Sequence, residues 1–160
     1  MRPALLLVVA LGVGQTPGRY ESADAKCRVT FPAKPTEAKK PLRPGGEAMV
    51  HMVQFEDADG GRLLLWNEIT AKGADPAKVL KGAAEGIAKQ GKPVSDKETT
   101  VGPDKVPARD VVADTPEGYR VRTLLVVANN RLYQVTVTGS NEFVAGPKAD
   151  EFRKSFELLK

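Results

Sequence analysis

The chain has one cysteine and one histidine, Cys27 and His51, and these two residue types can form a nucleophile and its general base. Such chemistry needs a thiolate beside an imidazole that a third group orients. Regular pairing in the hairpin that holds His51 would place Asn67 opposite it, so a small hydrolase or thiol enzyme is the enzymatic alternative. However, Cys27 alternates with Val29 and Phe31, and this period of two predicts a strand with one buried face. We therefore expect Cys27 to be a small buried apolar residue.

Three acidic residues, Asp57, Asp59 and Glu68, occupy positions one, three and twelve of a calcium-loop register. Position six of such a loop needs glycine for its sharp turn, but Arg62 stands there, and the residues after it favour a strand. One histidine and one cysteine cannot form a zinc site without several carboxylates, and the sequence has no glycine-rich phosphate loop before a helix. We therefore expect neither a metal nor another cofactor.

Tryptophan, tyrosine and arginine are the residue types that most often anchor protein interfaces. The chain has a single tryptophan, Trp66, and Tyr119, Arg120 and Arg122 lie close together in one predicted strand. These four residues are the predicted binding residues. The alternative for Trp66 is a core position opposite Met52, and the alternative for the arginines is a solvated rim.

The formal net charge of +4 is too small an excess to indicate nucleic-acid binding by itself. The densest basic cluster is Lys34, Lys39, Lys40 and Arg43, and it falls in a proline-rich segment that we expect to be a solvated loop. Binding of a polyanion or of the cell-envelope surface through this cluster is the alternative, and such binding would depend steeply on salt. We expect no nucleic acid among the partners.

The N-terminal residues have the pattern of a secretory signal peptide. Arg2 precedes an apolar run over residues 4–13, and Gly14 is one of the small residues at a plausible cleavage site. This run is about half of the roughly twenty residues that a membrane-spanning helix needs. We therefore predict a signal peptide over residues 1–14 and an exported protein, periplasmic or secreted, that does not span a membrane once cleaved; an uncleaved anchor is the alternative.

The elements that would position these residues begin with the strand at 27–31, and prolines then predict an extended connection. Two segments rich in strand formers, 48–56 and 62–70, are joined by DADGG and predict a hairpin. Regular pairing across this turn would set three residue pairs opposite each other: Phe55 with Leu63, Val53 with Leu65, and Met52 with Trp66. Both faces of the hairpin would then be apolar, so we expect both to be covered.

A helix is predicted after this hairpin, with Asp75 as its N-cap, Pro76 in its first turn and Gly91 as its C-terminal cap. Its apolar residues recur at intervals of three and four: Leu80, Ala83, Ala84 and Ile87. Gly82 and Gly86 each cost about 1 kcal/mol relative to alanine in a helix. A close approach of this helix to a sheet would explain them.

The second half of the chain predicts mainly strands. Residues 94–113 form two strands that break around Gly102, and a hairpin turns at Asn129 and Asn130, since asparagine tolerates positive φ. A C-terminal amphipathic helix is predicted from its apolar spacing and its entry through a Gly-Pro pair, with these residues: Gly146, Pro147, Phe152, Phe156 and Leu159. Strands that cluster and join by short turns indicate an antiparallel α+β fold.

The sequence resembles the PsbP-like fold family, which includes the Ran-binding Mog protein and many small exported bacterial proteins of unknown function. The resemblance lies in an opening strand that ends in VTFPAKP, a hairpin before a helix, the strand VPARDV and the closing SNEF and FRKSFELL segments. It covers residues 20–160 and implies a single domain with an antiparallel sheet sandwiched between helices. Because relatives serve as binding or assembly partners of larger complexes, it implies a non-enzymatic interaction domain. We expect a monomer with an unknown protein partner.

Overall fold

The structure, a computed structural model, describes residues 18–160, so the predicted signal peptide at 1–14 lies outside the described residues. A seven-stranded sheet has the strand order β3-β4-β5-β9-β8-β7-β6, and every neighbouring pair is antiparallel. Its strands are β3 (Thr36–Pro41), β4 (Met49–Glu56), β5 (Gly60–Glu68), β6 (Lys92–Val101), β7 (Val106–Asp114), β8 (Arg120–Ala128) and β9 (Arg131–Gly139). A three-stranded sheet consists of β1 (Gly18–Ser22), β2 (Cys27–Phe31) and β10 (Glu157–Leu158).

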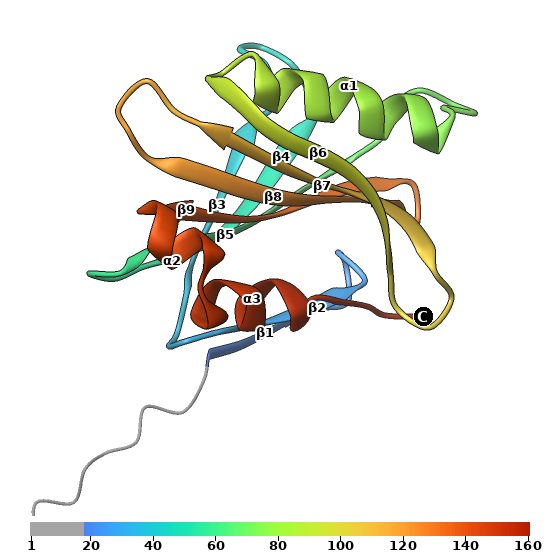
Figure 1. Cartoon of the computed structure of the whole chain (residues 1–160). Coiled ribbons are helices and arrows are strands. Elements are labelled where there is room, and N and C mark those ends of the chain that lie inside the picture. The colour runs from blue at the N-terminus through green and yellow to red at the C-terminus, as the bar shows by residue number, and fades with distance from the viewer. Residues whose placement is uncertain (1–17) are drawn as a thin grey trace, which may run out of the picture.

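Different elements cover the two faces of the large sheet (Figure 1). Helix α1 (Pro76–Ala88) lies on one face, where Leu80 packs with Val111 and Leu125. The small sheet lies below the other face with α2 (Asn141–Ala145) and α3 (Pro147–Lys154). The expected antiparallel α+β architecture is confirmed, but the expected sandwich between helices is wrong in part, because a second sheet shares the cover of this face.

Helix α1 packs against β7 and β8 and leaves the β4–β5 part of the same face without a helix. There Met52 pairs with Leu65, and both side chains stay partly exposed, as do Val50 and Leu63. The expectation that both faces of this hairpin are covered therefore holds for only one of them. On the covered face Val53, Leu64 and Trp66 are buried in the core between the two sheets.

The β4–β5 hairpin has a different register from the expected one. Val53 pairs with Leu64 and Phe55 with Arg62, whereas we expected Leu65 and Leu63. The cause is the turn, which holds four residues, 57–60, between the last paired residues. The Asp57 Oδ1 atom accepts hydrogen bonds from the backbone N–H groups of residues 59 and 60 and closes this turn. One residue fewer in the turn exchanges the two faces of one strand relative to the other.

Two predicted elements follow their local signals closely. The β8–β9 hairpin turns at Asn129 and Asn130, which have φ values of 51° and 57°, as the asparagine pair predicts. Asp75 is the N-cap of α1, and its Oδ1 atom accepts a hydrogen bond from the N–H of Ala77 at 2.9 Å. These signals succeed because the turn and the cap are each determined within a few residues.

The glycines around α1 have other roles than expected. The helix is capped by Lys89, and Gly91 lies beyond its end, where a Cβ atom would meet the carbonyl oxygen of Asp114 at 2.1 Å. Gly91 therefore allows the chain to pass close to the end of β7. In contrast, a Cβ atom on Gly82 or Gly86 would meet nothing within 4 Å, so the expected close approach to the sheet is wrong.

Two other expectations are corrected by strand pairing. The segment expected to be a proline-rich loop contains β3, an exposed edge strand that pairs with β4. The C-terminal helix ends at Lys154 instead of continuing to residue 159, and the chain then pairs with β2 as β10. The Ser155 hydroxyl donates to the carbonyl of Phe152 at 2.7 Å and accepts the N–H of Thr30 at 2.9 Å, so it ends the helix and joins it to β2.

Candidate functional site

The structure does not bring the four predicted binding residues together. Gly60, at the start of β5, and Arg120, at the start of β8, both pair with Gly139. Trp66 lies further along β5, opposite Tyr133, toward the other end of the sheet. Tyr119 borders a cavity that residues of α2 and α3 also line, Arg120 pairs with Gly139 just before α2, and Arg122 contacts Asp150 of α3. The tryptophan belongs to the core.

Trp66 is 5% exposed and stacks on His51, with ring centroids 3.7 Å apart and an angle of 11° between the planes. The Arg131 guanidinium lies 5.7 Å from the centroid of the Trp66 ring. Burial, together with the positive charge of Lys39, lowers the pKa of His51 below its ordinary value, so this imidazole is neutral at pH 7. A polar cavity of about 500 Å³ borders this stack. Trp66 is thus a core residue, as the alternative interpretation of its strand predicts.

The cysteine is fully buried in the core, as its alternation with Val29 and Phe31 predicts. Burial raises the pKa of Cys27 to about 12, so the thiol is protonated at neutral pH and supplies no thiolate nucleophile. His51 faces Trp66 across the hairpin, and the expected position of Asn67 opposite it is wrong. The enzymatic alternative therefore loses the pairing of His51 with Asn67 on which its Cys-His-Asn set depended.

The end of the sheet that carries Tyr119 has a cavity at its surface. Tyr119 is 58% exposed and borders a cavity of about 660 Å³, which we call the Tyr119 hollow. Its other walls are the β4–β5 turn and the α2–α3 segment, including Glu142, Phe143, Pro147 and Lys148. Lys148 pairs with Asp59 at 2.6 Å, which joins α3 to the turn across this hollow.

Two glycines make room for the aromatic floor of the Tyr119 hollow. A Cβ atom on Gly60 would meet the ring of Phe143 at 2.7 Å, and one on Gly139 would meet it at 2.8 Å. The Arg62 guanidinium lies 4.9 Å from the centroid of the same ring, and its Nη1 atom donates to Asp57 at 3.1 Å. Arg62 is 2% exposed, so the ring covers a buried cation. In the sequence this arginine stands out only at position six of the calcium-loop register, and no local pattern indicates that it is buried under an aromatic ring.

The predicted arginines are both held by carboxylates. Arg120 makes two hydrogen bonds to Asp114, at 2.7 and 3.0 Å, so its guanidinium group is held in one orientation. This pairing lowers the pKa of Asp114 and raises that of Arg120, with the hydrogen bond between them as the largest cause in each case. Because the two strands pair Asp114 directly with Arg120, the contact follows from register.

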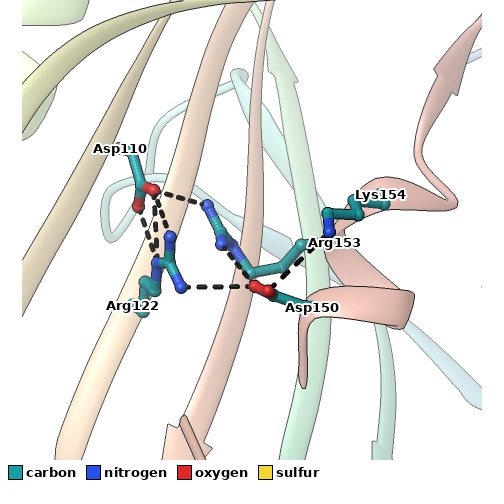
Figure 2. A network of polar contacts seen from close by, with 5 residues as sticks. All are labelled: Asp110, Arg122, Asp150, Arg153 and Lys154. Atoms are coloured by element: carbon teal, nitrogen blue, oxygen red, sulfur yellow. Dashed lines mark hydrogen bonds and ion pairs between the residues drawn. The ribbon is translucent and has the colours of Figure 1, made fainter. Parts of the chain in front are cut away.

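Arg122 belongs to a network of five charged side chains that joins β7 and β8 to α3 (Figure 2). Its guanidinium bonds to Asp110 at 2.7 Å and to Asp150 at 3.3 Å. Arg153 contacts the same two carboxylates at 2.9 and 3.5 Å, and Lys154 lies 3.8 Å from Asp150. Residues 153 and 154 follow Asp150 by three and four positions, and in a helix this spacing predicts side-chain contacts between them, so part of this network could be predicted from the sequence. Asp110 has no such local signal.

Comparisons with known proteins give a class for the fold. No family model matches the sequence, and no curated protein matches it either. Among solved structures, the chain is similar to cyanobacterial PsbP (CyanoP) from Synechocystis sp. PCC 6803, with a TM-score of 0.60 and 10% sequence identity. The match covers 94% of this chain and 96% of CyanoP. The fold is therefore PsbP-like, as the resemblance implied, and at this identity the likeness concerns the fold alone.

None of the helices within residues 18–160 is long and apolar enough to cross a membrane. No group of three or more histidine, cysteine, aspartate or glutamate side chains in this range is arranged to hold a metal ion. The acidic turn residues are used otherwise, since Asp57 closes the turn and pairs with Arg62, and Asp59 pairs with Lys148.

Proposed function

We propose that this chain is a non-enzymatic interaction or assembly domain that acts outside the cytoplasm, and that a partner protein contacts it through Tyr119 and the Tyr119 hollow. The observation that carries the proposal is the exposure of a tyrosine beside a cavity whose lining includes the Phe143 ring. Interface anchors are enriched in tyrosine and arginine and pack into pockets of this kind. Arg120 supports the assignment because its side chain is already ordered by Asp114.

The PsbP-like fold supports the proposal only through the resemblance, which implies roles in binding and assembly. Export is supported by the apolar run over residues 4–13 with its basic start and small residues. Trp66 is not part of the proposed contact, because it is buried at the other end of the large sheet. Arg122 is not assigned to the proposed contact either, because its guanidinium group is bonded to the carboxylates of Asp110 and Asp150.

Photocrosslinking in the native host tests the proposed contact. A photoreactive amino acid at position 119 should give one dominant adduct, identified by mass spectrometry. Matched positions are Leu42 and Val94, which are large exposed apolar residues at other places on the surface. The proposal requires that these two positions do not capture the same protein and that Tyr119→Ala abolishes its co-purification. Equal capture from all three positions, or none from position 119, would contradict it.

Cell fractionation tests the proposed location independently. The mature protein should be found in the periplasm or the medium, and its N-terminal sequence should begin after Gly14. A protein that keeps residues 1–14 and sediments with membranes would support an uncleaved anchor instead. A protein that keeps them and stays in the cytosolic fraction would contradict export.

A further inference from the structure

A second cavity lies beside the charged network of Figure 2, where α3 faces the large sheet. It has a volume of about 320 Å³ and is lined by Arg122, Arg153 and Lys154, with Asp150 as its acidic residue. Its apolar wall consists of Val101, Leu124 and Phe156. A pocket that combines several cations with an apolar wall fits a ligand with an anionic end and an apolar body.

The charges around this cavity do not balance. The network contains three cations, from Arg122, Arg153 and Lys154, and two carboxylates, from Asp110 and Asp150. Its formal charge is therefore +1. The pairing of Lys154 is the weakest of these contacts, because its Nζ atom lies 3.8 Å from Asp150 and its side chain is 80% exposed. This ammonium group can turn into the cavity at little cost.

Arg153 is buried, and one of its donors has no partner in the described part of the chain, although its two Nη atoms contact Asp110 and Asp150. It is only 8% exposed, and its Nε atom has no hydrogen-bond partner among residues 18–160. Burial lowers the pKa of Arg153 even though Asp110 acts in the opposite direction, and the charge of Arg122 lowers it further. A buried cation whose charged form is disfavoured next to an open cavity is stabilised when an anion enters.

We propose that this cavity binds a small organic carboxylate, whose carboxylate group lies toward Arg153 and Lys154 and whose apolar part packs on Leu124 and Phe156. The apolar wall favours an organic acid over inorganic phosphate, because phosphate has no apolar surface to bury there. Guanidinium groups match the planar geometry of a carboxylate. This site lies apart from Tyr119, which does not line it, so it does not depend on the proposed protein contact.

Calorimetric and NMR titrations of the purified protein with benzoate test this proposal, with phosphate at equal ionic strength as the second probe. Benzoate should bind saturably and shift the amide signals around Leu124 and Phe156. Lys154→Gln should weaken binding several-fold, and Arg153→Gln should abolish it. Arg109→Gln is the matched control, because Arg109 lies on the opposite face of β7 and pairs with Asp96. The Arg109→Gln variant should bind benzoate as the wild type does.

Lys154→Gln keeps the test decisive if Arg153→Gln does not fold, because the Lys154 side chain is exposed and removing its charge should not disturb the core. Absence of saturable benzoate binding would overturn the proposal. Equal binding by the wild type and Lys154→Gln would overturn it as well. Tighter binding of phosphate than of benzoate would overturn the assignment to an organic acid.

Discussion

At the scale of single residues, glycine is needed where the ends of β5 and β9 meet. Gly139 has a φ of +159°, and a Cβ atom there would collide with the ring of Phe143. Gly139→Ala should therefore lower the free energy of unfolding by roughly 1–3 kcal/mol. Urea unfolding measures this, with Gly118→Ala as control, because Gly118 has a φ of +88° but open space around it. Equal losses in both variants would show that the ring contact does not matter.

The stabilising contribution of the Asp110 carboxylate should be lost in acid. Burial alone would raise its pKa, but the hydrogen bonds and charges of Arg122 and Arg153 lower it below the ordinary value. A lowered pKa in the folded state stabilises the protein above the unfolded-state pKa of about 4, and this contribution is lost as pH falls through the folded-state pKa. Asp110→Asn should therefore be destabilised by roughly 1–3 kcal/mol at neutral pH.

The difference between wild type and Asp110→Asn should shrink on acidification, because protonation of the wild-type carboxyl removes the charge that the two arginines stabilise in the folded state. Denaturant unfolding at about pH 7 and about pH 3 measures this difference. A difference that stays constant over this range would assign the cost to shape or hydrogen bonding and not to the charge of the carboxylate.

Sequence patterns predict some residues of the site better than others. The burial of Cys27 could be predicted because its neighbours at a spacing of two are apolar. The burial of Arg62 and Arg153 could not, because groups distant in the sequence help to enclose them: Phe143 lies over Arg62, and Asp110 pairs with Arg153. An arginine in a strand or helix has the same local pattern whether it is solvated or enclosed.

At the scale of elements, α1 is less stable than its packing allows. Gly82 and Gly86 are exposed, and both have room for a side chain. Gly82→Ala and Gly86→Ala should each raise the free energy of unfolding by about 1 kcal/mol, because alanine has the higher helix propensity. Thermal and urea unfolding of the single and double variants measure this gain. A loss in either variant would indicate a backbone contact that the open space does not reveal.

The elements also differ in how far their sequences predict them. The Asn129–Asn130 turn and the cap at Asp75 are local, and both are confirmed. The β4–β5 register depended on whether the turn takes four residues or five, which the bonds of Asp57 decide. The short β10 could not be predicted, because its apolar residues also fit a helical spacing and its pairing with β2 decides between the two.

At the scale of the whole molecule, access to Cys27 requires the two sheets to separate. The thiol lies in the core between them, and burial raises its pKa to about 12. A thiol reagent at pH 8 should therefore react only as fast as the protein opens, and the rate should rise with urea in step with the fluorescence change of Trp66. Val94→Cys in a Cys27→Ala background should react at once, because Val94 is exposed. Fast labelling of the native wild type would contradict this packing.

The overall architecture could be predicted from clustered strands and from the PsbP-like pattern, but the second layer could not. The sequence has apolar residues on both faces of its ribbons, and helices are one of two ways to cover them. The small sheet uses β1, β2 and β10, whose pairing joins residues 27–28 to 157–158. Contacts between residues so far apart in the chain produce no periodic sequence pattern from which they could be predicted.

The pairing of β2 with β10 also determines when the small sheet can form during synthesis. The apolar side of β2 faces the core that the large sheet and α3 share, where the rings of Phe31 and Phe152 lie 4.9 Å apart, and β10 pairs along its edge. A nascent chain therefore emerges from the ribosome with β2 unshielded until its last elements follow. General chaperones that hold exposed apolar strands would have their longest interval of access at this segment.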